Sequence, residues 1–446
     1  MTIKETGWMD ENVLDFVQSF RLPLYGKVID VVGNLVYADL SESHLGSMCE
    51  ISVSKNKTKV LCEVVGFRHG HSLLMPYGPL SGIKARDLIC VKKDQSQVFL
   101  SQDLIGGIFD SLLQPLGSET LKSKSKIGEW CLLEGSICDP LLRARIHKPI
   151  AMGIRAIDSL LTMGEGQRLG ILAGTGVGKS VLLGSIARGC SSDVNVIALI
   201  GERGREVREF IENDLGEEGL KRSVVIVVTS DQSPLLRIRG AKLATTIAEY
   251  FSRQGRQVLL MMDSLTRVAQ AQREIGLAVG EPPTTKGYPP SVFSLLPRLL
   301  ERCGPQKKES GSISALFSVL VDGDDFNDPI PDAARGILDG HIVLTRELAE
   351  KQHFPAIDIN KSISRLMKEI CNEEHLQMAG KIKSLIAEYQ ANLDLIQIGQ
   401  YRSGQNQELD LAIQHMPNIN RFLQQGMKDT YSFEQSMKDF NDLFYK

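Results

Sequence analysis

The stretch Leu172-Ala-Gly-Thr-Gly-Val-Gly-Lys-Ser180 constrains the fold more than any other part of the chain. An apolar run ends there, a glycine-rich turn follows, and a helical pattern begins at Val181. From Ala173 to Ser180 the turn matches a phosphate-binding loop, with Ala173 where the usual pattern has its first glycine. Its three glycines allow positive φ angles, so that successive backbone N–H groups and the positive end of the next helix face a polyphosphate.

This interpretation predicts a nucleotide site. Lys179 would reach the β- and γ-phosphates, and the hydroxyl of Ser180 would hold Mg²⁺. The alternative is an ordinary glycine-rich turn between a strand and a helix, but the order of strand, loop and helix favours the phosphate site. The predicted nucleotide-binding residues of the loop are Ala173, Gly174, Thr175, Gly176, Val177, Gly178, Lys179 and Ser180.

Composition narrows the class of protein. With 446 residues, 42% hydrophobic and 24% charged, the chain is expected to be globular with two or three domains. A net charge of −3 argues against a general nucleic-acid binder. The eight cysteines are scattered, no apolar run has transmembrane length, and the N-terminus lacks a signal-peptide core. These features predict a cytoplasmic protein with reduced thiols.

The hydrophobic pattern divides the chain into four parts. Residues 1–20 contain an amphipathic stretch, 8–20, which we interpret as a docking helix rather than a helix packed on its own domain. Short strands broken by turns over 21–92 predict a small β-barrel. Residues 93–365 form the predicted P-loop ATPase domain, and 366–446 form a helical domain with helices near 366–400, 407–415, 418–427 and 432–443.

Apolar runs alternate with helical stretches after the phosphate loop. The helical stretches lie near 205–214, 233–252 and 291–303. This alternation predicts an α/β fold with a parallel sheet covered on both faces and ligand chemistry at the carboxyl ends of its strands. The strand candidates are 194–200, 224–228, 258–262, 313–319 and 341–344.

Two carboxylates stand where predicted strands end. Val258-Leu-Leu-Met-Met-Asp263 has the Walker B arrangement, which places Asp263 near Mg²⁺ opposite Ser180. Glu202 ends another strand, where it can orient and polarise a water molecule for attack on the γ-phosphate. The neighbouring Arg208 and Glu209 are interpreted as a solvated helix face.

Several segments together identify a family. The chain resembles the hexameric ATPases of flagellar and virulence-type type III protein export, which are related to the catalytic subunit of rotary ATP synthases. The resemblance runs from about residue 20 to residue 440. It is carried by Gly153-Ile-Arg-Ala-Ile-Asp158, Gly176-Val-Gly-Lys-Ser180, Ile200-Gly-Glu-Arg-Gly-Arg-Glu-Val-Arg-Glu-Phe210, Asp263-Ser-Leu-Thr-Arg267, Gly287-Tyr-Pro-Pro290, Leu338-Asp-Gly-His-Ile-Val-Leu344 and Pro355-Ala-Ile-Asp-Ile-Asn-Lys-Ser-Ile-Ser-Arg365.

The resemblance implies that the core is RecA-like, and it implies roles for single residues. Glu202 matches the catalytic glutamate, and Arg203 and Arg267 match arginines near the γ-phosphate. Arg365 matches an arginine finger that reaches the site of a neighbouring subunit. Phe354 matches the aromatic residue that stacks on adenine. The segment Arg421-Phe-Leu-Gln-Gln-Gly-Met427 matches the other wall of the adenine pocket. The implied catalytic set is Lys179, Glu202, Arg203, Asp263, Arg267 and Arg365, with ATP and Mg²⁺ as ligands.

The resemblance also implies partners and a location. It implies a homohexamer in the bacterial cytoplasm, peripheral at the inner membrane through its partners, and it implies no nucleic acid. A coiled-coil stalk protein would sit in the pore, facing the loops 280–293 and 322–332. A stator-like regulator would bind the N-terminal helix, and the ring would serve an export gate, export substrates and chaperones. The flagellar branch is favoured over the virulence branch by the segment 323–335.

Three alternatives remain beside an export ATPase. A rotary ATP synthase subunit has the same fold, but Gly204-Arg-Glu-Val-Arg-Glu-Phe210 and Asp339-Gly-His-Ile-Val343 argue against it. A hexameric RNA translocase would need a basic, aromatic face on the barrel, and residues 21–92 do not have one. A non-catalytic ring subunit would lack the water-polarising carboxylate, whereas Glu202 is present.

Overall fold

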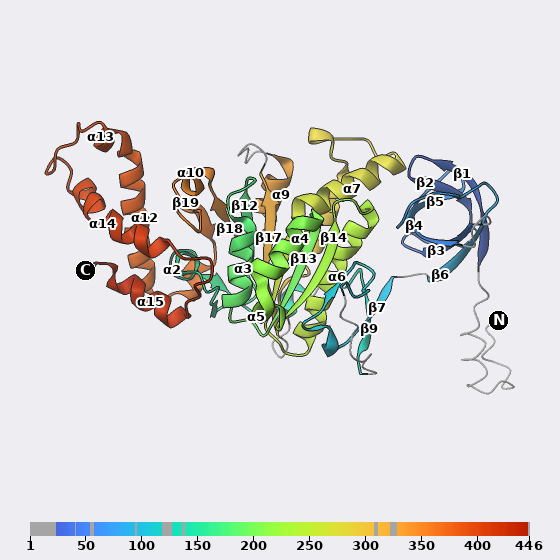
Figure 1. Cartoon of the computed structure of the whole chain (residues 1–446), viewed down its shortest axis with the longest axis horizontal. Helices are drawn as coiled ribbons and strands as arrows, with labels where there is room; N and C mark the ends of the chain where they lie inside the picture. The colour runs from blue at the N-terminus through green and yellow to red at the C-terminus, as the bar shows by residue number, and fades with distance from the viewer. Residues whose placement is uncertain are drawn as a thin grey trace. The chain divides into compact units, whose positions relative to one another are not determined.

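The computed structural model describes two compact units, one up to Ser96 and one from Gln97 onward (Figure 1). Within the described part of the chain, no helix is long and apolar enough to cross a membrane. The predicted docking helix 8–20 and most of the acidic loop 322–332 lie outside the described residues. These residues are 24–40, 42–53, 58–93, 96–117, 127–135, 139–306, 311–321 and 328–444.

The first unit is a closed β-barrel, as the short strands predicted. Its strands neighbour one another in the order β1-β2-β5-β4-β3-β6. Alternate residues point into a small apolar core that includes Val36, Ile51, Val64 and Ile89. The strands are β1 (Tyr25–Val32), β2 (Leu35–Asp39), β3 (Met48–Val53), β4 (Thr58–Arg68), β5 (His71–Pro76) and β6 (Leu88–Lys93).

The second unit is built on a nine-stranded sheet whose central strands are parallel, in the order β19-β18-β12-β17-β15-β13-β14-β8. The edge strand β19 runs antiparallel to β18, and a short β16 pairs with β17. The sheet is therefore mixed, whereas the sequence predicted a parallel one. The strands are β8 (Ile108–Phe109), β12 (Arg168–Ala173), β13 (Val194–Glu202), β14 (Ser223–Thr229), β15 (Val258–Asp263), β16 (Gly304–Pro305), β17 (Ser312–Leu320), β18 (Gly340–Leu344) and β19 (Ile357–Ser364).

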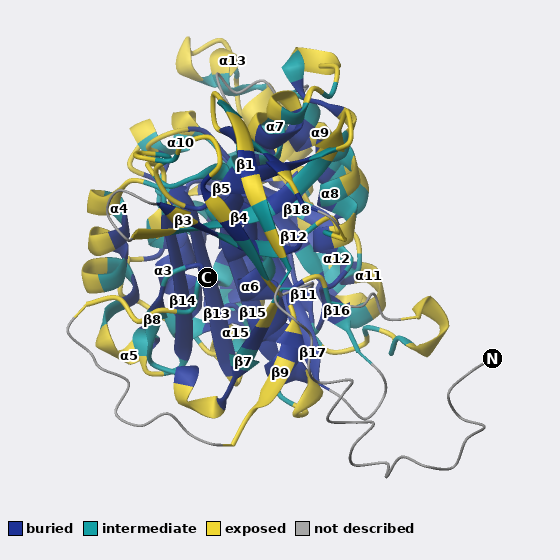
Figure 2. Cartoon of the chain, turned by 90° about the vertical axis from the view of Figure 1, so that its right-hand side faces the viewer, coloured by how far each residue is buried: buried dark blue, intermediate teal, exposed yellow. Residues whose placement is uncertain are grey.

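Two hydrophobic cores cover the two faces of this sheet. Along β13, Ile197 and Leu199 face one core, while Val196, Ala198 and Ile200 face the other. Figure 2 shows the central strands buried throughout, which explains their continuous apolar sequences. The first core includes α2 (Arg155–Leu160), α3 (Lys179–Gly189), α4 (Gly204–Glu209) and a π-helix (Phe210–Leu215). The second includes α6 (Pro234–Arg253), α7 (Leu265–Val279), α8 (Pro290–Leu300) and α9 (Pro329–Ile337).

The sequence analysis did not predict α7, although residues typical of helix caps stand at both of its ends. Ser264 caps the first turn by accepting a hydrogen bond from the backbone N–H of Arg267, and Gly280 ends the helix with a φ of 94°. The helix matters for the site because it begins directly after Asp263.

The C-terminal helices pack together beside α2 (red in Figure 1). The prediction of separate helices at 407–415 and 418–427 is wrong, because α14 runs unbroken from Gln407 to Leu423 through Pro417. A proline inside a helix costs about 3 kcal/mol, and the buried face that includes Met416 and Ile419 stabilises the continuous helix. The remaining helices are α5 (Gly216–Leu220), α10 (Arg346–Glu350), α11 (Met367–Ile370), α12 (Glu373–Ala391), α13 (Leu393–Gln397), α14 (Gln407–Leu423) and α15 (Phe433–Asn441).

Candidate functional site

The site forms where three strands of the central sheet end. The phosphate loop follows β12, Asp263 ends β15, and Glu202 ends β13. In the sheet, β17 separates β12 from β15, and β13 lies on the other side of β15. Because these strands are parallel, their carboxyl ends share one edge of the sheet, where a doubly wound fold binds ligands.

The loop leads from Ala173 into α3 through two left-handed glycines. Gly176 has a φ of 79° and Gly178 a φ of 87°, which only glycine adopts without strain. Gly174 is not among the residues with positive φ, so the loop uses this freedom at two of its three glycines. Val177 is buried and anchors the loop, whereas Thr175 and Ser180 are exposed. Backbone donors and the start of α3 therefore border an accessible space.

Lys179 lies between the two carboxylates. Its Nζ donates to Oδ1 of Asp263 and stands 3.7 Å from Oε1 of Glu202. Burial, and after it the charge of Asp263, raises the pKa of Glu202 to about 7, although Lys179 opposes the rise. A carboxyl group poised near neutral pH can serve as a general base. Three of the predicted catalytic groups thus converge.

Ser318 completes this cluster, and the sequence analysis missed it. It lies on β17 and is fully buried, and its Oγ donates to Oδ1 of Asp263 at 2.6 Å. Nothing in the local sequence marks this serine, because it stands inside an apolar strand. Only the strand order predicts its contact: β17 separates the phosphate-loop strand from the strand that ends at Asp263.

The three predicted arginines lie in different surroundings. Arg267 is half-buried on α7, where its side chain packs beside Gly201, next to Glu202. Arg203 also follows Glu202, but its side chain is 78% exposed and pairs with Glu206 at 3.3 Å. Arg365 is exposed and donates to the backbone oxygen of Arg335.

The register of the sheet places Arg365 away from the phosphate loop of its own chain. Ser364 pairs with Gly340 in β18, and the next residue of β18, His341, pairs with Gly170 near the start of β12. The phosphate loop begins at the other end of β12, after Ala173. Measured along β12, about 13 Å therefore separates the position of Arg365 from the start of the phosphate loop.

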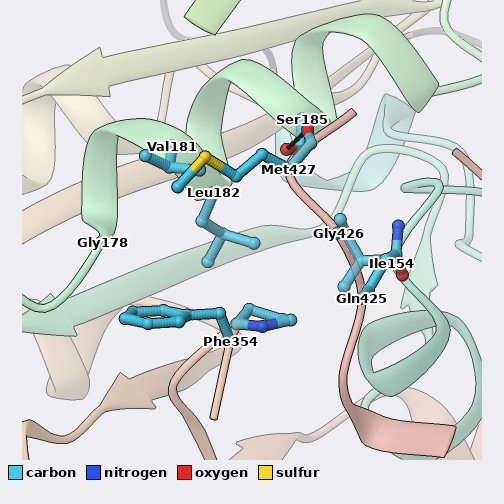
Figure 3. A pocket seen from close by; sticks show the side chains of 10 residues that line it. Ile154, Gly178, Val181, Leu182, Ser185, Phe354, Gln425, Gly426 and Met427 are labelled. Atoms are coloured by element: carbon cyan, nitrogen blue, oxygen red, sulfur yellow. Dashed lines mark hydrogen bonds between the residues drawn. The ribbon is translucent and has the colours of Figure 1, made fainter. Parts of the chain in front are cut away.

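A mainly apolar pocket adjoins the loop (Figure 3). Phe354 forms one side, and its ring would lie 3.5 Å from a side chain added at Gly178. The opposite wall comes from the segment between α14 and α15, so the structure brings the predicted Phe354 and Met427 to one pocket. The lining residues are Ile154, Gly178, Val181, Leu182, Ser185, Phe354, Pro355, Gln425, Gly426 and Met427.

Hydrogen bonds hold the C-terminal wall of this cavity. The buried amide of Gln425 donates to the backbone oxygen of Gly153 at 2.8 Å, and its side-chain oxygen accepts from the backbone N–H of Arg155 at 3.1 Å. Ser185 on α3 donates to the backbone oxygen of Met427 at 2.9 Å. The guanidinium of Arg155 stacks 4.4 Å from the ring centre of Tyr431. Gln425 lies in the segment 421–427 that the resemblance implied as a pocket wall, whereas the sequence analysis gave Arg155 no role in the pocket.

A hydroxyl and a carboxylate are suitable ligands for Mg²⁺. Ser180 is exposed in the first turn of α3. Asp263 is the last residue of β15, and its carboxylate oxygens lie at the same edge of the sheet. Magnesium prefers such oxygen donors together with phosphate oxygens and water. Of the two Asp263 oxygens, only Oδ1 accepts hydrogen bonds from the described residues, which leaves Oδ2 for a metal.

Family models match three segments of the chain. The β-barrel domain model of the ATP synthase alpha/beta family matches residues 28–90. The nucleotide-binding domain model of the same family matches residues 153–364. A model of the C-terminal domain of the type III secretion ATPase EscN matches residues 371–442.

Similar proteins cover nearly the whole chain. A flagellum-specific ATP synthase of Bacillus subtilis is 50% identical, across 94% of this chain and 95% of its own length. A type 3 secretion system ATPase of Xanthomonas euvesicatoria is 46% identical, across 93% and 92%. The solved structure of the assembled ATPase EscN from enteropathogenic E. coli superposes with a TM-score of 0.88 at 45% identity, covering 94% of this chain and 99% of that one. A second EscN structure, in complex with its central stalk EscO, gives a TM-score of 0.86 at 44% identity, covering 94% and 99%.

Proposed function

The chain belongs to the family of flagellum-specific ATP synthases and type 3 secretion system ATPases, and from this premise we propose that it hydrolyses Mg²⁺-bound ATP in a homohexameric ring to drive protein export. The observation that carries the proposal is the cluster of Lys179, Asp263 and Glu202 at the strand ends, beside a phosphate loop. The flagellar branch is the one we propose.

The residues of the cluster divide the chemistry among them. Lys179 exchanges its carboxylate partners for the β- and γ-phosphates, because the phosphates carry more negative charge. Ser180 and Asp263 hold Mg²⁺, which when bound neutralises charge on the phosphate oxygens. Glu202 orients the attacking water and accepts its proton. Arg267, beside Gly201, adds positive charge at the same end of the sheet.

Phe354 and the wall that includes Met427 bind the base of ATP. The cavity is mainly apolar and adjoins Gly178, so a base stacked on Phe354 lies close to phosphates held by the loop. Arg203 is exposed and pairs only with Glu206 on α4 among the described residues, so it can exchange this partner for a nucleotide or a neighbouring subunit.

Arg365 acts in a neighbouring subunit. Its position near the start of β12, together with its exposure, supports a contact outside its own chain. A guanidinium delivered in this way stabilises charge on the transferring phosphoryl group and is worth ~10³–10⁵ in rate. The similar EscN was solved as an assembled ATPase, which supports a ring for this chain too.

Mixed rings test the ATPase function and the ring together. A Lys179→Ala subunit has a defective loop and an intact finger, whereas an Arg365→Ala subunit has the reverse. Each variant alone should be nearly inactive. In a random 1:1 mixture, an intact loop meets an intact finger at about a quarter of the interfaces, so hydrolysis should return.

Light scattering confirms that both variants assemble before activity is compared. Assembled mixed rings that stay inactive at every mixing ratio would contradict a finger that acts in a neighbour. Activity retained by Arg365→Ala alone would show that this arginine has no catalytic role.

We base the remaining proposed partners on membership of the same family. We propose a coiled-coil stalk in the pore, because EscN was solved in complex with its central stalk EscO, and a stator-like regulator at residues 8–20. Export substrates, chaperones and an export gate complete the machinery, at the cytoplasmic face of the bacterial inner membrane. Deletion of residues 1–20 should abolish co-purification of the regulator while ATP hydrolysis by the purified enzyme persists.

A further inference from the structure

Ser318 occupies a position between the two halves of the phosphate site. Its strand β17 pairs with β12, which carries the phosphate loop, and with β15, which carries Asp263. Ser318 lies opposite Ile171 in the first pairing, and Phe317 lies opposite Met262 in the second. Ser318 is thus the residue of β17 level with Asp263, and its hydroxyl reaches Oδ1 at 2.6 Å.

The end of β17 is also fixed to the segment that follows Asp263. The backbone N–H of Leu320 donates to the hydroxyl of Thr266 at 2.9 Å, at the start of α7. The strand that carries Ser318 therefore cannot shift without moving the Asp263 turn. This anchor gives the contact between Ser318 and Asp263 a defined geometry.

The same Asp263 oxygen receives two donors, and nucleotide binding would remove one of them. In the structure, both Lys179 and Ser318 donate to Oδ1. If Lys179 turns to the phosphates, Asp263 remains a carboxylate with a side chain 5% exposed, close to the charge of Glu202. A buried charge without a donor is costly and reorients to find one.

We propose that Ser318 is a positioning residue of the nucleotide site. Its hydroxyl would hold Oδ1 of Asp263 when Lys179 moves to the phosphates, so that Oδ2 would stay available to Mg²⁺. This inference rests on the proposed Mg²⁺-dependent function of Asp263. Supporting groups of this kind typically contribute 10–100-fold to metal affinity or activity.

Ser314 provides a matched control on the same strand. It lies four residues earlier, on the same face of β17, and is 1% exposed. Its hydroxyl accepts from the backbone N–H of Gly166 at 2.8 Å, at the opposite end of the strand from Asp263. Ser314→Ala and Ser318→Ala therefore each remove one buried hydroxyl and one hydrogen bond, but only the second removes it from the site.

The experiment measures how strongly Mg²⁺ promotes nucleotide binding. A fluorescent ADP analogue is titrated into the full-length protein at a series of Mg²⁺ concentrations and in excess chelator. We expect Ser318→Ala to raise the Mg²⁺ concentration needed for half-maximal binding by about 10-fold, with little change of affinity in chelator. Ser318→Thr, which keeps a hydroxyl, should restore the wild-type midpoint to within about 3-fold, and Ser314→Ala should match wild type.

Thermal unfolding of both alanine variants separates positioning from simple destabilisation. Comparable melting temperatures with a shifted Mg²⁺ midpoint only in Ser318→Ala support the proposal. A wild-type midpoint in Ser318→Ala, or an equal shift in Ser314→Ala, overturns it. Asp263→Asn shows which inference has failed: if it also keeps the wild-type midpoint, the proposed metal role of Asp263 is wrong, and if it loses Mg²⁺ dependence while Ser318→Ala does not, only the role of Ser318 is wrong.

Discussion

The two ends of the nucleotide site are built in different ways. The phosphate end takes its charged groups from the ends of two parallel strands and from α3, which follows the phosphate loop, and Lys179 already contacts both Asp263 and Glu202. The base end is mainly apolar and joins Phe354, which follows α10, to Gln425, Gly426 and Met427 beyond α14. Ligand binding at the phosphate end depends on charged groups that the sheet positions. Ligand binding at the base end depends on packing between segments that are distant in the sequence.

This difference predicts that the two ends can be separated by mutation. Changes at the phosphate end should affect catalysis and the binding of any polyphosphate. Changes at the base end should affect only ligands that carry a base, and by smaller factors, because stacking contributes less than charge stabilisation in the transition state.

The largest effect is expected for Lys179→Ala. Loss of the ammonium group that faces the β- and γ-phosphates should lower kcat by about 10³-fold or more. It should also weaken competition by inorganic tripolyphosphate, which has no base. Steady-state ATPase assays with tripolyphosphate as inhibitor measure both. If tripolyphosphate still inhibited ATP binding as strongly as in wild type, Lys179 would not contact the phosphates.

Glu202→Gln should separate binding from turnover within the phosphate end. The amide cannot accept a proton from the attacking water, so kcat should fall by about 100-fold or more while the dissociation constant for ATP changes little. Rapid-quench assays measure kcat, and equilibrium binding measures the dissociation constant for ATP. The exposed Glu209→Gln, on α4, is the matched control and should retain wild-type turnover. Turnover at the wild-type rate in Glu202→Gln would exclude Glu202 as the base.

Phe354→Ala should give a smaller effect that is confined to the base end. Loss of stacking should weaken ATP binding by about 10-fold, which corresponds to about 1.4 kcal/mol, with kcat at saturation preserved. Inhibition by tripolyphosphate should stay unchanged, and Phe354→Tyr should bind ATP as wild type does. A parallel loss of tripolyphosphate binding would indicate that Phe354 supports the loop at Gly178 rather than the base.

The same difference explains what could be predicted from the sequence. The phosphate loop and the strand that ends at Asp263 are continuous in the chain, and a parallel sheet brings strand ends together, so local patterns sufficed. The base pocket has no local pattern, because its walls lie about 70 residues apart (Phe354 and Gln425). Only the resemblance to export ATPases pointed to Phe354 and Met427.

The parts that were missed depend on packing and strand order. Ser318 lies within an apolar strand, and only the place of β17 in the sheet shows that it contacts Asp263. The sequence analysis placed a break between residues 415 and 418, where Pro417 stands, yet the buried face of α14 outweighs the hydrogen bond that the proline removes. Periodicity reports which face is buried, but it does not report how strongly burial stabilises a helix.

The smallest expected effect concerns stability at the phosphate end. The pKa of Glu202 is raised to about 7, mainly by burial and then by Asp263, whereas an unfolded chain would have a value of about 4.3. The folded state therefore binds this proton more tightly than the unfolded state. The resulting stabilisation is fully present below the unfolded pKa and is lost as pH rises through about 7.

Glu202→Gln should consequently melt at a higher temperature than wild type at pH 8, by about 2 °C, when nucleotide and metal are removed with chelator. The advantage should shrink as pH falls through about 7 and disappear only below the unfolded pKa of about 4.3, where Glu202 is protonated in both states and resembles the amide. Differential scanning fluorimetry across this range, with Glu209→Gln as control, measures the difference. An advantage independent of pH would show that the carboxylate is not strained by its buried, negatively charged surroundings. A melting-temperature advantage that grows with pH would mean that the ionised carboxylate of Glu202, which catalysis needs, destabilises the folded protein. The mainly apolar base pocket has no counterpart of this charge.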